Sequence, residues 1–211
     1  MRYLYIDTSS SYLYTAIVEN EKLLSEIKEE FGQSLSEVAL PKIASMFEKT
    51  NLEAKDINKI IVVDGPGSFT GIRIGITIAK VYAWSLNIPI TTITSLEAMA
   101  LSSDEEKVHV PMINARRGYV YTAIYDKDYN ELLKPQHMKL EDLLKELEKI
   151  SEYEFISNDK FDGIENIKEY NPNLEKVVNY FKDKDSVNPH AVNPEYLKLT
   201  AAEESKLWLQ K

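Results

Sequence analysis

Residues 72–86 are apolar at most positions, and they directly follow a glycine-rich stretch at 65–71. Their apolar side chains recur at three- and four-residue spacing along two faces at once, which predicts a helix that is covered on more than one side. The β-branched run at 59–63, ahead of the glycines, predicts a buried strand. We therefore expect one face of the helix to pack on a sheet and the other on a second helix or a second protein.

Residues 33–49 predict another helix with the same surplus of apolar surface, because its apolar residues also fall on two neighbouring faces. Ser34, with Glu37 three residues further on, predicts a capping box at the helix start. Pro41 either argues against a helix here or bends it. The extra apolar face of each helix is covered either by the rest of the chain or by a partner, and the sequence leaves both interpretations open.

The other elements of the N-terminal half alternate in a way that predicts the fold class. They are strands at 3–7, 12–18, 22–29 and 89–94 and a short helix at 95–100 that Ser95 is expected to cap. Antiparallel hairpins followed by alternating helix and strand predict a mixed sheet with helices on its faces.

A polar stretch at 102–107 predicts a boundary between an N-terminal domain over 1–103 and a smaller, divergent C-terminal domain over 104–211. The elements expected in the second domain are strands at 109–114 and 119–125, a short strand after 130, a helix at 140–150, a strand at 153–157 and a helix at 173–181. Residues 201–208 predict a returning helix or an ordered tail. The second domain therefore reads as a reduced version of the first.

Composition narrows the functional classes. The chain has 211 residues and no cysteine, which excludes disulfides and thiolate chemistry. No stretch reaches the ~20 apolar residues of a membrane helix, and the N-terminus reads as a strand and not as a signal peptide, so we expect a cytoplasmic protein. The net charge of −9 is unsuited to holding a nucleic acid without a partner, because phosphate contacts need clustered Lys and Arg.

The glycine-rich stretch predicts a strand-to-helix turn in which Ser68 or Thr70 caps the helix. It lacks the Gly-Lys-Ser/Thr ending of a P-loop, and Pro66 and Thr70 stand where a G-x-S-x-G nucleophile elbow has glycines. Two interpretations stay open: a structural turn, and a loop that binds a ligand.

Few residues predict catalytic chemistry. The three histidines, His109, His137 and His190, form no metal-binding motif. The turn Asp7–Thr8–Ser9 at the end of the first strand is either an ordinary hairpin turn or a place for a nucleotide phosphate or magnesium. Arg116 and Arg117 are either solvated turn residues, or one of them pairs with a carboxylate across an interdomain groove.

One family resemblance is specific. The motif at 65–75 resembles the signature of the TsaB (YeaZ) family of bacterial tRNA threonylcarbamoyladenosine synthesis, through Gly65, Pro66, Gly67, Ser68, Phe69, Thr70, Gly71 and Arg73. Stretches at 1–10, 94–98, 115–121 and 193–197 also resemble the family, whereas 126–190 match it weakly. Asn114 and Tyr119 depart from the Asp and Glu that the family usually has there.

The resemblance implies an α/β, actin-like (ribonuclease-H-like) fold with two βββαβα-type subdomains and mixed sheets, the second reduced. It implies a non-catalytic subunit that binds and stabilises TsaD, which places threonylcarbamoyl on the adenosine next to the anticodon of tRNA. TsaD carries a His-x-x-x-His pair where this chain has Leu35–Ala39. No metal and no cofactor are expected; ATP or ADP would sit at the TsaD interface or at a vestigial site formed by Asp7, Thr8 and Ser9.

The resemblance also implies the partners. TsaD is expected to pair with the helices 33–49 and 70–86, the ATPase TsaE to join a ternary complex, and tRNA to bind only through that complex; the chain alone is expected to form a homodimer through the same helices. The residues expected in this partner interface are Leu35, Ala39, Ile43, Met46, Ile72, Ile76 and Ala83.

Two alternatives belong to other functional classes. The first is a small actin-like ATP-binding enzyme of kinase or carbamoyl-transfer type, which predicts nucleotide binding through Asp7 and Thr8. The second is a metalloprotease homologue, against which the absence of a metal-ligand motif argues.

Overall fold

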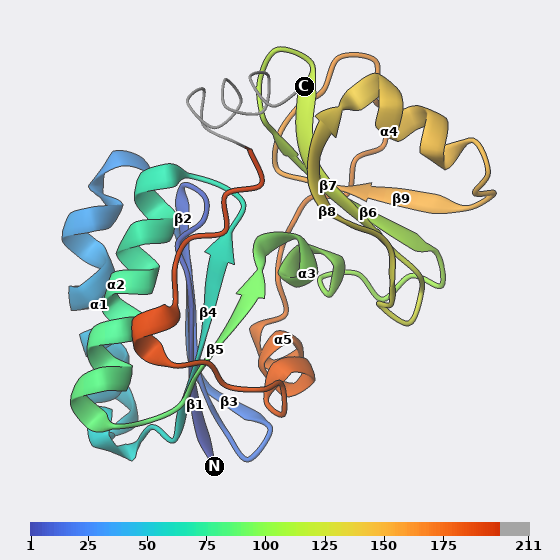
Figure 1. Ribbon diagram of the computed structural model, residues 1–211. Helices are drawn as coiled ribbons and strands as arrows, with labels where there is room; N and C mark the ends of the chain where they lie inside the picture. The colour runs from blue at the N-terminus through green and yellow to red at the C-terminus, as the bar shows by residue number, and fades with distance from the viewer. Residues whose placement is uncertain (199–211) are drawn as a thin grey trace. The chain divides into compact units, whose positions relative to one another are not determined.

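A computed structural model describes residues 1–198 of the chain, which form two compact units (Figure 1). The first unit contains Met1–Asp104 and Tyr170–Glu195. The second contains Glu105–Glu169 and the described residues that follow Glu195. The sequence predicted one continuous second domain over 104–211, and this was wrong for residues 170–195. These residues return to the first unit because their apolar side chains, among them Val178 and Val192, are buried there.

The first unit is built on a five-stranded mixed sheet in the order β3-β2-β1-β4-β5. Its strands are β1 (Arg2–Asp7), β2 (Tyr12–Glu19), β3 (Lys22–Glu30), β4 (Lys59–Gly65) and β5 (Ile90–Thr94). The first three strands pair antiparallel as consecutive hairpins, and β4 and β5 run parallel to β1. This is the meander followed by parallel crossovers that the alternating pattern predicted.

Helices cover both faces of this sheet (Figure 1). On one face lie α1 (Leu35–Thr50) and α2 (Phe69–Leu86), and on the other lies α5 (Leu174–Phe181). Side chains alternate along a strand, so Leu4 and Ile6 of β1 enter the core under α1 and α2, while Tyr5 faces the α5 side. The short elements of the unit are η1 (Gly32–Ser34), η2 (Ala54–Asp56), α3 (Ser95–Ala100) and η3 (Pro189–Ala191).

The helix starts differ in part from prediction. Ser68 caps α2 as predicted, since its Oγ accepts a hydrogen bond from the Gly71 N–H. Thr94, not Ser95, caps α3, and it forms a reciprocal capping box with Glu97. The capping box predicted at Ser34 is absent, because η1 precedes α1 and the Ser34 hydroxyl donates to the Phe31 carbonyl instead. Helix α1 continues through Pro41.

The second unit has a four-stranded sheet in the order β8-β7-β6-β9. Its elements are β6 (Val108–Asn114), β7 (Tyr119–Tyr125), β8 (Glu131–Lys139), α4 (Leu140–Leu147) and β9 (Tyr153–Ile156). Strands β6, β7 and β8 are antiparallel neighbours and β9 runs parallel to β6. The order βββαβ is a shortened copy of the first unit, which confirms the predicted actin-like α/β class.

Two remaining expectations concern residues 201–208 and membrane-spanning helices. The helix or tail predicted at 201–208 lies outside the described residues. Among residues 1–198, no helix has the length and apolar character that crossing a bilayer requires.

Candidate partner-binding surface

The glycine-rich stretch connects the end of β4 to the start of α2 and is held by the β1–β2 turn. The Ser68 N–H donates a hydrogen bond of 2.6 Å to the Ser9 carbonyl oxygen. The buried Thr8 hydroxyl donates to the Gly71 carbonyl oxygen at 2.7 Å. The turn that follows β1 is therefore fastened directly onto the first turn of α2.

The motif glycines permit this close contact. A Cβ on Gly71 would overlap the Thr8 carbonyl oxygen, and a Cβ on Gly67 would overlap the Ser9 carbonyl oxygen. Both overlaps are with backbone atoms, which have little freedom to move. The two glycines are thus required by packing within the first unit, and this geometry favours the interpretation of 65–71 as a structural turn.

The turn Asp7–Thr8–Ser9 does not fit a nucleotide phosphate or a magnesium ion. The exposed fractions are 1% for Asp7, 0% for Thr8 and 7% for Ser9. The Asp7 carboxylate accepts a hydrogen bond of 2.8 Å from the Ser9 N–H, and burial raises the pKa of Asp7. Its charge helps to raise the pKa of the buried Tyr5 and of Tyr170 in the segment 170–195. Of the two places expected for ATP or ADP, the vestigial site at this turn is therefore buried by the chain itself, and the TsaD interface stays a prediction.

The residues predicted to form the partner interface are buried within the single chain, and that assignment was wrong. Their exposed fractions lie between 0% and 4%, and all of them belong to the core of the first unit: Leu35, Ala39, Ile43, Met46, Ile72, Ile76 and Ala83. These positions follow the stripe of each helix that faces the sheet, so the sheet covers them and a partner has no access to them.

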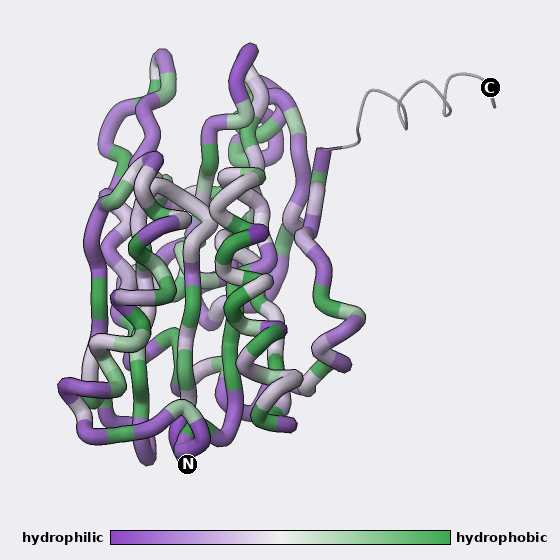
Figure 2. Tube along the Cα trace, turned by 90° about the vertical axis from the view of Figure 1, so that its left-hand side faces the viewer, coloured by the Kyte–Doolittle hydropathy of each residue, from purple (hydrophilic) through white to green (hydrophobic). Residues whose placement is uncertain are grey.

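The neighbouring face of each helix carries the apolar surface that the fold leaves open. Leu40 of α1 is 49% exposed and Val81 of α2 is 56% exposed. Ala44 is also exposed, and Ile74 and Ile78 are partly exposed at the rim of the core. We call these five residues the outer helical surface. Figure 2 looks onto the side of α1 and α2, where hydrophobic residues recur along both helices.

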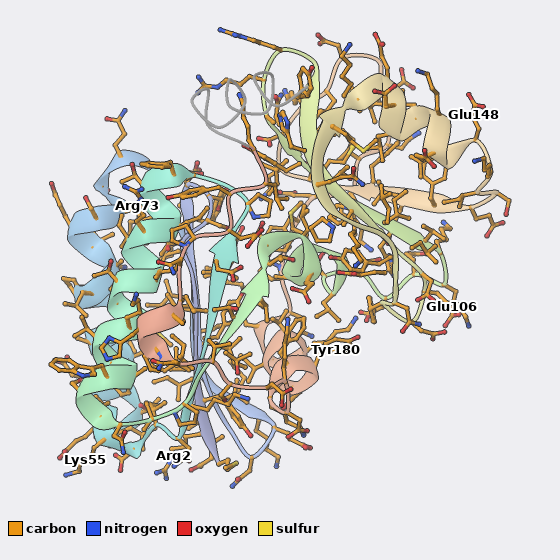
Figure 3. The ribbon with its side chains drawn as sticks, in the orientation of Figure 1. Arg2, Lys55, Arg73, Glu106, Glu148 and Tyr180 are labelled. Atoms are coloured by element: carbon orange, nitrogen blue, oxygen red, sulfur yellow. The ribbon has the colours of Figure 1, made fainter. Side chains whose placement is uncertain are left out.

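Two aromatic residues flank the outer helical surface on α2. Phe69, the first residue of α2, is 56% exposed. The guanidinium carbon of Arg73, which Figure 3 labels, lies 3.8 Å from the Phe69 ring centroid. Trp84 is 67% exposed near the end of α2, and its ring contacts His190 of η3 edge to face. The sequence pattern had marked this second face as apolar, but periodicity alone did not say which face the sheet would cover.

Charged residues also lie at the end of β4 and in the turn between β6 and β7. Asp64 at the end of β4 is largely buried, and burial raises its pKa to about 7, with the nearby Glu195 and Glu97 carboxylates adding to the rise. Arg116 and Arg117 lie exposed in the β6–β7 turn. Their predicted pairing with a carboxylate of the other domain stays a prediction. Within residues 1–198, no three His, Asp or Glu side chains are grouped so as to hold a metal ion.

Comparison with known proteins identifies relatives along the whole chain. Residues 22–203 match the family model of TsaD, tRNA N6-adenosine threonylcarbamoyltransferase. The chain is 32% identical over 229 aligned residues to the tRNA threonylcarbamoyladenosine biosynthesis protein TsaB of Bacillus subtilis (strain 168), with 100% of both chains covered. It is also 32% identical to TsaB of Escherichia coli (strain K12) over 133 residues, which is 62% of this chain and 57% of that protein.

Solved structures show the same fold. YeaZ from Pseudomonas aeruginosa superposes with a TM-score of 0.69 at 17% identity, covering 93% of this chain and 99% of that one. A structure described as an uncharacterized protein with similarity to the peptidase YeaZ from the same organism reaches a TM-score of 0.73, also at 17% identity and with the same coverage. At this identity the likeness concerns the fold alone.

Proposed function

The chain belongs to the TsaB family of tRNA threonylcarbamoyladenosine biosynthesis proteins, and we propose that it acts there as a non-catalytic subunit that binds and stabilises TsaD. The contact on this chain is the outer helical surface of α1 and α2. In the cell the protein works in the cytoplasm, with TsaE joining the pair and tRNA reaching it through the complex.

The exposure of the outer helical surface carries the proposal. Monomeric proteins seldom leave large apolar patches exposed. Here α1 and α2 already bury one apolar stripe each against the sheet, and Leu40 and Val81 on the neighbouring faces are still about half exposed. The helix pair is long enough to present several turns to a partner, since α1 has 16 residues and α2 has 18. Two helices packed against two helices supply roughly the 800 Å² per partner of a stable interface.

The closed β1–β2 turn supports the non-catalytic part of the proposal. An actin-like enzyme needs an open phosphate site at this turn, whereas here Thr8 and Ser9 bond to the α2 start and Asp7 is buried. The glycines that a phosphate loop would use for close ligand approach are used for contact with the chain's own backbone. The β1–β2 turn of an actin-like enzyme is thus present in this chain, but the chain's own atoms occupy the place beside it where a phosphate would bind.

Without TsaD, the same surface pairs with a second copy of the chain. A two-fold arrangement presents the outer helical surface to itself, which satisfies the self-complementarity of an isologous dimer. TsaD and the second copy then compete for the same residues, because both cover Leu40 and Val81.

Gel filtration with light scattering tests the proposal directly. The chain alone should elute as a homodimer, and addition of TsaD from the same organism should replace it by a one-to-one complex. A chain that stays monomeric and leaves the elution of TsaD unchanged would remove the proposal. The competing ATP-binding enzyme would instead show itself by saturable binding of ATP with magnesium.

A further inference from the structure

One face of the β7–β8 hairpin in the second unit carries a row of rings. Tyr119 and Tyr121 are two residues apart on β7 and therefore point to the same side of the sheet. The strand register pairs Tyr121 with His137 of β8, and pairs Tyr119 with Lys139. Val120, between the two tyrosines, belongs to the core on the opposite side. The hairpin thus has a core face and an aromatic face.

The His137 ring contacts both tyrosine rings, and all three rings remain partly exposed. The Tyr119 and His137 rings stack at 4.8 Å between centroids with an interplanar angle of 7°. Tyr121 lies 5.3 Å from His137 and is tilted by 47°. All three side chains are of intermediate burial. Neighbouring strands therefore hold a continuous aromatic row at the surface of the second unit.

Cations border this row. Arg116 and Arg117 are exposed in the turn that leads into Tyr119, and both have left-handed backbone, with φ of 66° and 54°. Lys139 is exposed opposite Tyr119. Within the described residues of the second unit, none of the three forms a salt bridge with an acidic group, and the nearby Asp142 is paired with Lys145 at 2.9 Å.

We propose that this patch, formed by Arg116, Arg117, Tyr119, Tyr121, His137 and Lys139, binds unpaired nucleotides of RNA. Aromatic side chains on adjacent strands stack on splayed-out bases, and arginines beside them neutralise the phosphates between those bases. An anionic lipid surface would use the cations but has no need of a row of stacked rings. The inference goes beyond the proposed TsaD pairing, because it concerns the second unit and gives this chain a weak RNA contact of its own, beside the stronger contact with tRNA that it gains through the complex.

The acidic charge of the chain as a whole sets the strength of this contact. With a net charge of −9, long-range attraction of RNA is weak, and binding depends on the local patch. The patch therefore acts as an accessory contact, which holds an exposed loop of RNA and contributes less than a dedicated basic groove would. Single-stranded or looped RNA should bind better than a fully paired duplex, whose bases are not free to stack.

Fluorescence anisotropy with the full chain tests the proposal. The probes are a labelled RNA hairpin with an unpaired loop and a labelled RNA duplex of equal length, titrated over a series of salt concentrations. We expect the hairpin to bind about 10-fold more tightly than the duplex, in line with the contribution of one stacked base. Replacing Tyr119→Leu should weaken hairpin binding about 10-fold, whereas Tyr119→Phe should leave it unchanged because it keeps the ring.

A charge-matched pair of variants completes the test. Arg116→Asn with Arg117→Asn removes two charges and keeps residues that tolerate left-handed backbone; it should lower the slope of log affinity against log salt by about 1.4, which is 0.7 for each lost phosphate contact. Lys134→Gln with Lys149→Gln removes two exposed charges elsewhere in the second unit and should leave both affinity and slope unchanged.

Three results would overturn the inference: no hairpin binding even at low salt, equal losses in the two double variants, or no effect of Tyr119→Leu. TsaD binding by the Arg116→Asn and Arg117→Asn double variant is measured in parallel and should equal that of the unaltered chain. If a variant loses RNA binding and still pairs with TsaD, the result bears on the RNA-binding patch alone. If every variant fails to pair with TsaD, the result bears on the proposed function alone.

Discussion

The Thr8 hydroxyl donates a hydrogen bond of 2.7 Å to the Gly71 carbonyl oxygen, and the Thr8 carbonyl oxygen occupies the space where a side chain on residue 71 would begin. This contact joins two parts of the chain that are 63 residues apart. It explains why a glycine stands inside the first turn of a helix, where alanine normally has the higher propensity. It also places the end of β1 against the helix start that an anion would otherwise approach.

The first prediction concerns Gly71. In an exposed helix, replacing glycine with alanine stabilises a protein by up to about 1 kcal/mol, but Gly71→Ala should destabilise this one by about 1–3 kcal/mol because the new methyl group overlaps the Thr8 backbone. Urea unfolding followed by circular dichroism measures the change. The control is Thr77→Ala at an exposed position of the same helix, and a Gly71→Ala protein as stable as this control would contradict the account.

The second prediction concerns nucleotide binding. Because Asp7 is 1% exposed and Thr8 is fully buried, calorimetry with ATP and magnesium should show no saturable heat for the chain alone. Asp7→Ala should change stability and leave this result unaltered. Saturable binding that Asp7→Ala abolishes would instead support the actin-like ATP-binding enzyme.

The third prediction concerns Asp64 and pH. Its pKa is raised from 3.8 to about 7 in the folded chain, so between these values the folded state holds a proton that the unfolded state has released. Folding is then favoured at low pH, and this contribution is lost as pH rises towards 7, by about 1.4 kcal/mol for each pH unit. Above pH 7 both states are ionised, and the contribution no longer changes.

Asp64→Asn removes this dependence. Urea unfolding at pH 5 and at pH 8 gives the difference in unfolding free energy between the variant and the unaltered chain. This difference should shift in favour of the variant by about 2–3 kcal/mol from pH 5 to pH 8. Asp162→Asn, at an exposed aspartate of the second unit, is the control and should show no such difference. A parallel pH profile for Asp64→Asn and the unaltered chain would show that Asp64 is ionised in both states.

The fourth prediction concerns Lys59, which holds the segment after α5 against the first sheet. Its ammonium group donates to the Lys182 and Lys184 carbonyl oxygens at 2.9 and 2.6 Å. Lys59→Met leaves both carbonyls without this donor and should cost about 1–3 kcal/mol. Lys55→Met, at a side chain that is 70% exposed and forms a surface ion pair with Glu53, should cost less than about 1 kcal/mol.

Hydrogen exchange locates the effect of Lys59→Met. Amide protection should fall first in α5 and the residues that follow it, because these are the groups that Lys59 holds. Uniform loss of protection over the whole first unit would contradict a local role for this lysine.

The sequence predicted most elements of the fold because their signals are local. The helix expected at 70–86 is observed at Phe69–Leu86, and the strand expected at 119–125 is observed with the same bounds. The predicted cap at Ser68 is confirmed, since one hydroxyl residue before an apolar run determines it. At the start of α3, Thr94 and Ser95 offer the same chemistry, and only the backbone of Thr94 has the extended conformation that a cap requires.

The errors concern relations between distant segments. Periodicity showed that α1 and α2 each have two apolar faces, but it did not show that the stripe with Ile43 and Ile76 meets the sheet. The return of residues 170–195 to the first unit depends on contacts such as that of Tyr170 with Tyr14, whose ring centroids lie 5.3 Å apart. Nothing in the order of elements along the chain predicts such a return. The burial of Asp7 likewise depends on contacts between segments that are far apart in the sequence.

Titration calorimetry of TsaD with two matched variants of this chain shows whether the outer helical surface binds TsaD. Val81 of α2 and Leu132 of β8 are both 56% exposed, so a glutamate at either position should be tolerated in the folded chain. Val81→Glu should weaken TsaD binding by at least about 100-fold, the loss expected for a charge buried in an interface, and Leu132→Glu should bind as the unaltered chain does. Unchanged affinity of a folded Val81→Glu protein would contradict the claim.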